Sequence, residues 1–357
     1  MSLRAARPVS ARAGAPLRRW VRPVRLGRWS MLLNLRVLLV GLALFLAVVV
    51  VSVALLGFGS INIPPGQIVD VLLGRGTGRN ELVIMSVRMP RLVTALAVGA
   101  SLGAAGAVFQ SVSRNVLGSP DIIGFSTGAA TGAVAQIILF GGGPFEVALA
   151  AIGGGLIASM VVYGISRRGG VSGGYRLILT GIGVGALLAA LNSYLLTRGG
   201  IDQAASANIW LSGSLVGRSW GQAGMTVLCL FVLFPFLAGL GRRLSLLEMG
   251  DDAARQLGVR VEGTRVLTLI FGVGLTAAAV AAAGPISFIA LAAPQLVRPM
   301  AKSAAVPIGL SALMGALLLC AADLLSQWAF GALVVPVGVV TGLIGGVYLI
   351  ILLAKRV

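Results

Sequence analysis

The chain has 357 residues, of which 57% are hydrophobic and 11% are charged, and its mean hydropathy is +0.99. These proportions exclude a soluble domain and predict that lipid surrounds most of the chain. The net charge of +18 does not indicate nucleic-acid binding, because the arginines concentrate in the N-terminal tail and in short links between apolar runs. With no histidine, and with Cys229 and Cys320 both inside apolar runs, the composition argues against a metal site or a disulfide framework.

The first 33 residues carry eight arginines and no acidic residue. This composition predicts a disordered cytoplasmic tail that lies against anionic lipid. The remaining residues, 34–357, are predicted to form a single transmembrane domain.

Ten apolar runs follow the tail, and they predict an all-α polytopic membrane protein with about ten transmembrane helices. The runs lie at about 37–56, 92–108, 122–140, 147–165, 177–196, 225–240, 266–282, 286–296, 308–325 and 339–353. Ten crossings place both termini and the arginine pairs in the cytoplasm, as the excess of positive charge on cytoplasmic loops requires. The links that hold Asp70, Glu81 and Asp202 then lie outside.

Small residues at helical spacing predict close packing between these helices. Three such pairs are Gly99 with Gly103, Gly181 with Gly185, and Gly342 with Gly346. In the link between the second and third runs, Ser119 precedes Pro120 and Asp121, an order that predicts a helix start.

The most polar internal stretch is 245–265, which predicts a short helix at 251–257 that ends at Gly258. The chain has no phosphate-binding loop, since no glycine stands in the five residues before Lys302–Ser303. It also lacks a motif that pairs a nucleophile with a base, so we predict that it is not an enzyme. Charges inside the apolar runs are nearly absent, apart from Asp323, for which a functional role and a wetted span end both stay open. Energy is therefore expected from a separate subunit that docks on 245–265.

Several motifs, in this order along the chain, resemble those of the permeases of iron–siderophore and vitamin B12 ABC importers. They are R-M-P-R (88–91), V-G-A-S-L-G-A-A-G-A-V-F-Q (98–110), R-N-V-L-G-S-P-D-I-I-G-F (114–125), M-G-D-D-A-A-R-Q-L-G-V (249–259), A-G-P-I-S-F-I-A-L-A-A-P (283–294), A-A-D (321–323) and P-V-G-V-V-T (336–341). Two positions depart from the family pattern: Val116 stands where proline is usual and Gln295 where histidine is usual.

The resemblance implies a permease subunit of a binding-protein-dependent importer in the cytoplasmic membrane of a bacterium, with a ferric siderophore of the catecholate type as cargo. It implies a second permease subunit, either identical or different, two cytoplasmic ATPases that hold ATP and magnesium, and an extracytoplasmic substrate-binding protein. This chain itself would need no cofactor and no metal. Vitamin B12 or haem as the cargo, and a stand-alone secondary carrier, stay open as alternatives.

The resemblance also implies roles for individual residues, and it assigns none of them to catalysis. ATPase coupling falls on Gly250, Asp251, Asp252, Ala254, Arg255, Leu257 and Gly258. Docking of the binding protein falls on Arg88 and Arg91. The candidates for the pathway and its gate are Ser126, Thr127, Gly173, Tyr175 and Asn192.

Overall fold

The computed structural model describes residues 21–26, 29–59, 61–76, 78–168, 171–172, 174–303, 306–329 and 335–354. Within these residues the chain is helical apart from two short antiparallel hairpins, which confirms the predicted all-α class. The helices are α1 (Leu35–Gly57), α2 (Pro65–Leu72), α3 (Arg79–Leu82), α4 (Met89–Ser113), α5 (Phe125–Ala135), α6 (Pro144–Ser166), α7 (Gly174–Arg198), α8 (Ile201–Leu211), α9 (Trp220–Gly239), α10 (Gly241–Glu248), α11 (Asp251–Gln256), α12 (Val261–Ala283), α13 (Ile289–Ala301), α14 (Ile308–Trp328) and α15 (Val337–Ala354).

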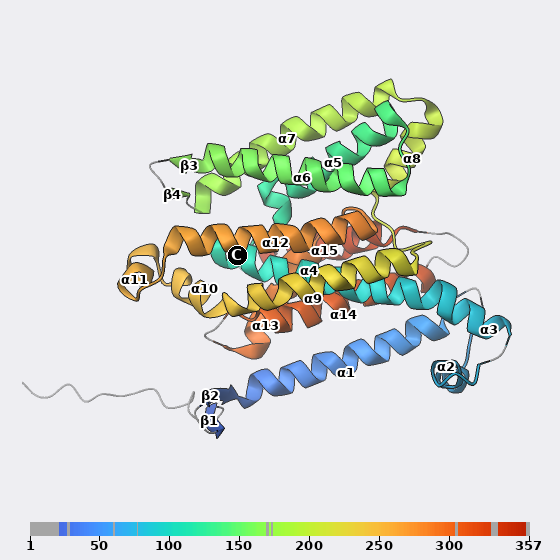
Figure 1. Ribbon diagram of the computed structural model, residues 1–357, viewed down its shortest axis with the longest axis horizontal. Coiled ribbons are helices and arrows are strands. Elements are labelled where there is room, and N and C mark those ends of the chain that lie inside the picture. Colours follow the sequence, from blue (N-terminus) through green and yellow to red (C-terminus); the bar gives the residue numbers. More distant parts are fainter. Residues whose placement is uncertain are drawn as a thin grey trace, which may run out of the picture.

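Each of the ten predicted runs falls on a helix, and the described residues contain seven helices long and apolar enough to span a membrane by length and composition. Two shorter apolar helices, Phe125–Phe140 and Val337–Ile351, account for the third and tenth runs. The eighth run corresponds to α13, which has only 13 residues. The long helices lie roughly parallel, with α2, α3 and α8 at one end and α10 and α11 at the other (Figure 1). This is the two-sided distribution of links that the charge pattern predicted.

The N-terminal segment differs in part from the disordered tail predicted for 1–33. Strands β1 (Val21–Leu26) and β2 (Trp29–Asn34) pair antiparallel, with Val21 opposite Asn34 and Leu26 opposite Trp29. The two arginines of β1, Arg22 and Arg25, are three residues apart, so the sequence shows no strand-like alternation here and gave no local signal for this hairpin. Residues 1–20 lie outside the described residues.

Helix α4 is the central element of the bundle. In the span that contains it, 83% of the most apolar window is buried, whereas the corresponding value for α1 is 11%. It packs against α9, α12, α13 and α14. Glycines allow this approach: a Cβ on Gly103 would lie 2.1 Å from the carbonyl oxygen of Ser311, and one on Gly99 would lie 2.5 Å from that of Gly315. The predicted packing role of Gly99 and Gly103 is therefore confirmed.

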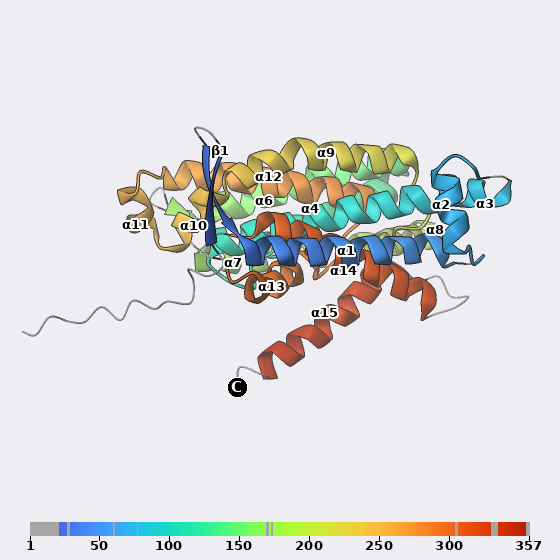
Figure 2. The same cartoon turned by 90° about the horizontal axis from the view of Figure 1, so that it is seen from below.

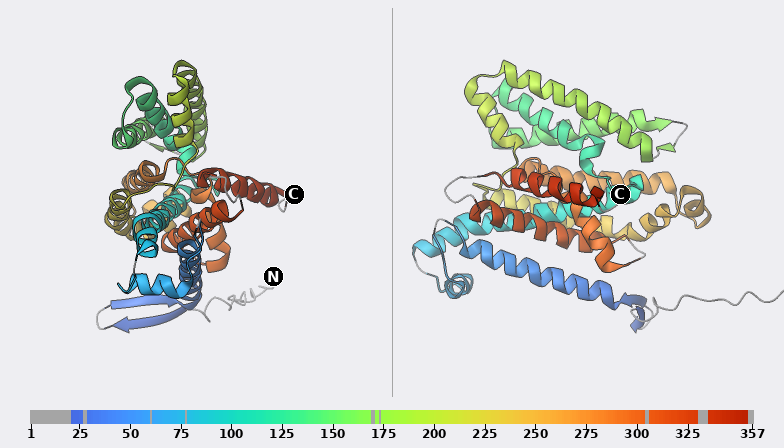
Figure 3. Two further views of the ribbon diagram at one scale, coloured as in Figure 1. Left: turned by 90° about the vertical axis from the view of Figure 1, so that its right-hand side faces the viewer. Right: turned by 180° about the vertical axis from the view of Figure 1, so that it is seen from behind.

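The helices α5, α6, α7 and α8 form a second group that lies beside the central one (Figures 1 and 3). Helix α15 leaves the central group at its N-terminal end and projects away from it (Figure 2). Its Gly342 and Gly346, a predicted packing pair, face open space in the single chain, because a Cβ on either would have no neighbour within 4 Å.

Candidate functional site

Helix α11 is set off from its neighbours by two glycines with positive φ angles. Gly250, which precedes the helix, has a φ of 118°, and Gly258, which follows it, has a φ of 81°. Side chains with a Cβ rarely adopt such angles, so glycine at both positions permits the sharp turns that isolate this short helix. Asp251 and Asp252 occupy its first turn and Arg255 its last turn, an arrangement that complements the helix dipole.

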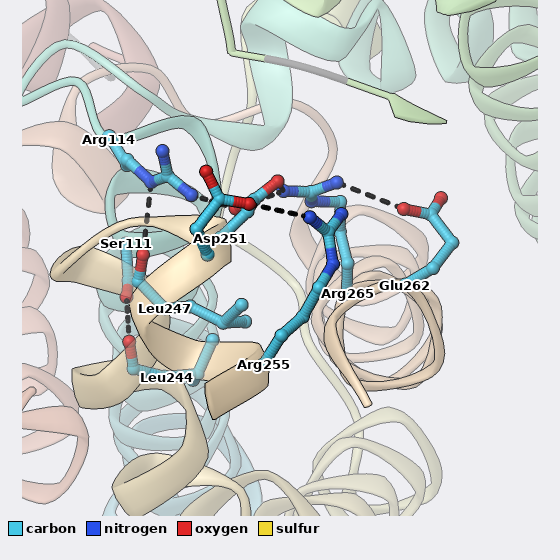
Figure 4. Close-up of polar contacts among 9 residues, drawn as sticks. Ser111, Arg114, Leu244, Leu247, Asp251, Arg255, Glu262 and Arg265 are labelled. Carbon is cyan, nitrogen blue, oxygen red and sulfur yellow. Dashed lines mark hydrogen bonds and ion pairs between the residues drawn. The ribbon is translucent and has the colours of Figure 1, made fainter. Parts of the chain in front are cut away.

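Asp251 anchors α11 to the two helices beneath it (Figure 4). Both of its carboxylate oxygens accept hydrogen bonds from Arg265 of α12, at 3.2 Å each, and one also accepts a hydrogen bond from Arg114. Arg114 caps the C-terminal end of α4, and its Nε also donates to the carbonyl oxygen of Leu247 at 3.0 Å. Arg265 in turn donates to Glu262 at 3.0 Å. The chain of ion pairs therefore ties α11 to the inner ends of α4 and α12.

These contacts set the ionisation of Asp251. Partial burial acts to raise the pKa of its carboxyl group, but the charges and hydrogen bonds of Arg265 and Arg114 outweigh this effect and leave the pKa below its ordinary value. Asp251 is therefore ionised at neutral pH, as its anchoring role requires.

Further contacts hold α10 and the start of α12 in place. Ser111 donates to the carbonyl oxygen of Leu244 at 3.5 Å, and Arg298 of α13 pairs with Glu248 at 2.7 Å. From α6, the hydroxyl of Tyr163 donates to Glu262 at 2.6 Å. Helices from both groups thus converge on the base of the α10–α11 segment.

The opposite face of α11 is free. The side chain of Asp252 is 93% exposed and that of Arg255 is 51% exposed, and the two form an ion pair of 2.9 Å on the surface. Leu257 and Met249 are exposed beside them, whereas Ala254 is fully buried. The residues assigned to coupling thus separate into an inner set that fixes the helix and an outer set that presents a mixed charged and apolar surface.

The two arginines assigned to docking both have partners within the chain. Arg91 forms a bidentate ion pair with Asp323 of α14, with distances of 2.6 and 2.9 Å. Arg88 donates to the carbonyl oxygens of Leu56, at 2.5 Å, and of Ile61. The sequence left open whether Asp323 has a functional role or lies at a wetted span end. In the structure it is a buried partner of Arg91 and links α14 to α4.

The candidates for the pathway lie on α5 and α7, which pack against each other. The hydroxyl of Ser126 donates to Asp121, and Thr127 lies near Gly185 of α7, where an added Cβ would be 3.7 Å from the threonine hydroxyl. The side-chain oxygen of Asn192 is buried without a hydrogen-bond partner among the described residues. Gly173 and the side chain of Tyr175 lie outside what the structure describes.

Sequence reasoning missed the contact between the two positions that depart from the family pattern. The side-chain amide of Gln295 donates to the carbonyl oxygen of Val116 at 2.6 Å, and the hydroxyl of Tyr348 on α15 donates to Gln295 at 3.1 Å. The chain separation of 179 residues between Gln295 and Val116 gives no local signal. That both residues depart from the pattern together was the one available hint. Gln295 thus joins the turn after α4 to α13 and α15.

Comparison with known proteins agrees with this geometry. Residues 40–355 match the model of the FecCD transport family. The ferric enterobactin transport system permease protein FepG of Escherichia coli is 43% identical over 321 residues, which cover 90% of this chain and 97% of that protein. The iron(3+)-hydroxamate import system permease protein FhuG of Bacillus subtilis is 35% identical, covering 87% of this chain and 95% of that protein. The cobalamin import system permease protein BtuC of Halobacterium salinarum is 37% identical, covering 77% and 74%.

A solved structure of a metal-chelate type ABC transporter in an inward-facing conformation superposes with a TM-score of 0.80 at 28% identity, covering 88% of this chain and 99% of that one. The family model spans all seven long apolar helices, apart from the first residues of α1. The chain belongs to the FecCD transport family, as a multi-pass permease of the ABC-importer type.

Proposed function

We propose that this chain is the permease subunit of an ATP-driven importer that carries a ferric siderophore of the catecholate type across a bacterial cytoplasmic membrane. The observation that carries the proposal is the 43% identity to FepG over nearly the whole of both chains. The described residues contain no group of three or more His, Cys, Asp or Glu side chains that could hold a metal. A pathway without ligands suits iron that is already enclosed in an organic chelate, because free Fe³⁺ would require oxygen or nitrogen ligands.

ATP and magnesium would be bound by two partner ATPases, for which the exposed face of α11 is the docking surface. Asp252, Arg255 and Leu257 offer both charged and apolar contacts, and the anchor at Asp251 would transmit force to α4 and α12. The chain would then have no enzymatic activity of its own.

A second permease subunit would cover α7 and α15, both of which leave many apolar side chains exposed in the single chain. In the most apolar window of α7 only 17% of residues are buried, and the projecting α15 has apolar residues on all sides. Apolar helices that expose small residues favour close helix–helix contact in lipid. The pathway candidates on α5 and α7 would then lie near the axis between the two subunits.

An extracytoplasmic binding protein would dock at the end that carries α2 and α3. Arg88 and Arg91 lie there, but their intramolecular partners leave only part of each guanidinium for an acidic partner; the side chain of Arg91 is 21% exposed. Charge reversal at Arg88 is therefore expected to weaken docking through both lost attraction and a displaced α1–α2 turn.

The experiment is uptake of radiolabelled ferric enterobactin by a deletion strain that expresses this chain with its partner subunits, with ferric hydroxamate and cobalamin as competitors. We expect ferric catecholate uptake that depends on the ATPases and ceases with an Asp252→Lys and Arg255→Glu double variant that still reaches the membrane. Preferential cobalamin uptake would favour the second candidate, which the 37% identity to BtuC supports. Uptake that persists without the ATPases and collapses with the proton gradient would identify a secondary carrier and refute the proposal.

A further inference from the structure

A pocket of about 370 Å³ lies at the end of the bundle opposite α11, where α6 and α8 meet α9 and α12. Its lining includes the indole of Trp210, the amide of Gln222 and the guanidinium of Arg218, together with aliphatic side chains from α6 and from the residues that precede it. Tryptophan and arginine are typical of the level where a protein crosses from hydrocarbon to lipid headgroups. The pocket is thus amphipathic, with a cationic side and an apolar side.

Arg218 has no partner in this pocket. It lies in the link between α8 and α9, it is half-buried, and none of its nitrogens forms a hydrogen bond or ion pair with a described residue, while its Nε is wholly buried. Burial lowers the pKa of its guanidinium, because a charge removed from water is costly without an opposite charge. Arg91, Arg114, Arg265 and Arg298 are each paired with a carboxylate, and Arg88 donates to two backbone carbonyl oxygens. Arg218 therefore lacks an anionic partner that would offset the cost of burying its charge.

A second cavity, of about 440 Å³, opens on the same seam between α6, α9 and α12 but deeper along the helices. Its walls are almost wholly apolar, with Leu156 from α6, Leu233 from α9 and Ile270 from α12 among them. On α9, eleven residues separate Gln222 of the first pocket from Leu233 of the second, a rise of about 16 Å at 1.5 Å per residue. That is close to half of the roughly 30 Å hydrocarbon core, the depth that one leaflet of acyl chains fills.

We propose that the seam between α6, α9 and α12 binds one anionic phospholipid of the outer leaflet, with its phosphate on Arg218 and an acyl chain in the Leu156–Leu233–Ile270 cavity. The phosphate supplies the missing anion, and the chain fills an apolar space that water would not occupy. An acidic side chain of a partner protein would satisfy Arg218 but would leave the deeper cavity empty. The spacing of the two cavities therefore favours a lipid over a protein partner.

The deeper cavity also reaches the coupling site. Tyr163, whose hydroxyl donates to Glu262, lines this cavity, and Glu262 belongs to the ion-pair chain that holds α11.

The test is native mass spectrometry of the full-length chain titrated with dioleoylphosphatidylglycerol, with dioleoylphosphatidylcholine and with glycerol 3-phosphate as separate probes. We expect one tightly retained phosphatidylglycerol in the wild type, weakened about tenfold or more in Arg218→Ala, because a hydrogen bond to a charged group contributes about 1.5–3 kcal/mol. Arg218→Lys should keep most of the retention. Arg79→Ala, which removes an exposed arginine at the same end of the bundle, should change nothing. Ser159→Phe, which fills the deeper cavity from a buried hydroxyl without a hydrogen-bond partner, should weaken the lipid and leave glycerol 3-phosphate unaffected.

Equal retention in Arg218→Ala and Arg79→Ala would overturn the proposal. So would binding of glycerol 3-phosphate as tight as that of the lipid, because the site would then hold a free anion. If Arg218→Ala instead weakens the extracytoplasmic binding protein and leaves lipid retention intact, the pocket is a protein-docking site and the lipid assignment is wrong.

Discussion

Replacement of Asp251 by asparagine tests whether the anchor of α11 governs coupling. The variant keeps the shape of the side chain and removes the charge that Arg265 and Arg114 share. The side chain of Arg265 is only 6% exposed, so it would lose one of its two acidic partners in a nearly dry position and would retain Glu262. We therefore expect the substitution to loosen the contact of α11 with α4 and α12 and to leave the rest of the bundle unchanged.

The magnitude follows from these contacts. Breaking a fully buried ion pair costs about 3–5 kcal/mol. The side chain of Asp251 is 21% exposed and Glu262 still neutralises Arg265, so the cost should fall to about 1.5–3 kcal/mol, the range for a hydrogen bond to a charged group. This corresponds to an increase of roughly 10- to 100-fold in the population with α11 detached.

Hydrogen exchange of the amides in 251–259, measured on the full transporter in nanodiscs, reads this population directly. Transport and ATP hydrolysis in proteoliposomes give the consequence: uptake should fall while hydrolysis by the partner ATPase continues. For the hydrogen-exchange measurement alone, Asp252→Asn is the matched control, because Asp252 is 93% exposed and pairs only on the surface, where an ion pair contributes under about 1 kcal/mol. Equal exchange rates in the two variants would refute the anchoring role of Asp251.

Three further predictions concern the pH dependence of α11, the Arg91–Asp323 ion pair and helix packing. The folded-state pKa of Asp251 is depressed, so the stabilisation that its carboxylate contributes is present above the unfolded pKa of about 3.9 and is lost as the pH falls through the folded pKa. Amide exchange in α11 should therefore rise only in that acid range. The rise should be absent from Asp251→Asn. Asp323→Ala should lower the free energy of unfolding by about 3–5 kcal/mol, seen as a lower melting temperature in detergent, and an Arg91→Met, Asp323→Leu double variant should recover most of it; equal melting temperatures of the single and double variants would contradict this. Gly106→Ala should destabilise by about 1–3 kcal/mol or more, since its Cβ would lie 1.7 Å from the carbonyl oxygen of Ala290, whereas Gly309→Ala on α14, with nothing within 4 Å, should not destabilise by the same measurement.

Hydropathy located the helices because a lipid environment demands long apolar runs, but it made several of them too short. The second run was predicted at about 92–108, whereas the continuous helix extends over Arg79–Ser113. The missing turns carry Arg88 and Arg91, whose charges end an apolar window. The structure keeps both in the helix because backbone carbonyls and Asp323 satisfy them. Since these partners lie far away in the chain, no local pattern could have predicted the longer helix.

Other omissions have the same origin. Helix α8 falls inside the predicted external link because Asp202 and Gln203 interrupt its apolar pattern. The sequence did predict α11, since its flanking glycines and first-turn aspartates are local signals. It did not predict which aspartate points inward, because that depends on Arg114, which is 137 residues away from Asp251. Local sequence signals therefore located α11. Its division into an anchoring face and an exposed face depends on tertiary contacts, which those signals do not show.

The two ends of α4 show why that anchor has consequences beyond α11. Near its outer end Arg91 is paired with Asp323 of α14, and at its inner end Arg114 is bonded to Asp251 and to the carbonyl oxygen of Leu247. Between them lies a helix of 25 residues, about 37 Å long, that is close-packed against its neighbours through glycines. A close-packed helix of this kind moves as a body, because packed interiors yield little to local strain. If α11 is the coupling helix, a displacement of it is therefore expected to reach the far face of the membrane through α4, with an ion pair at each end to transmit it.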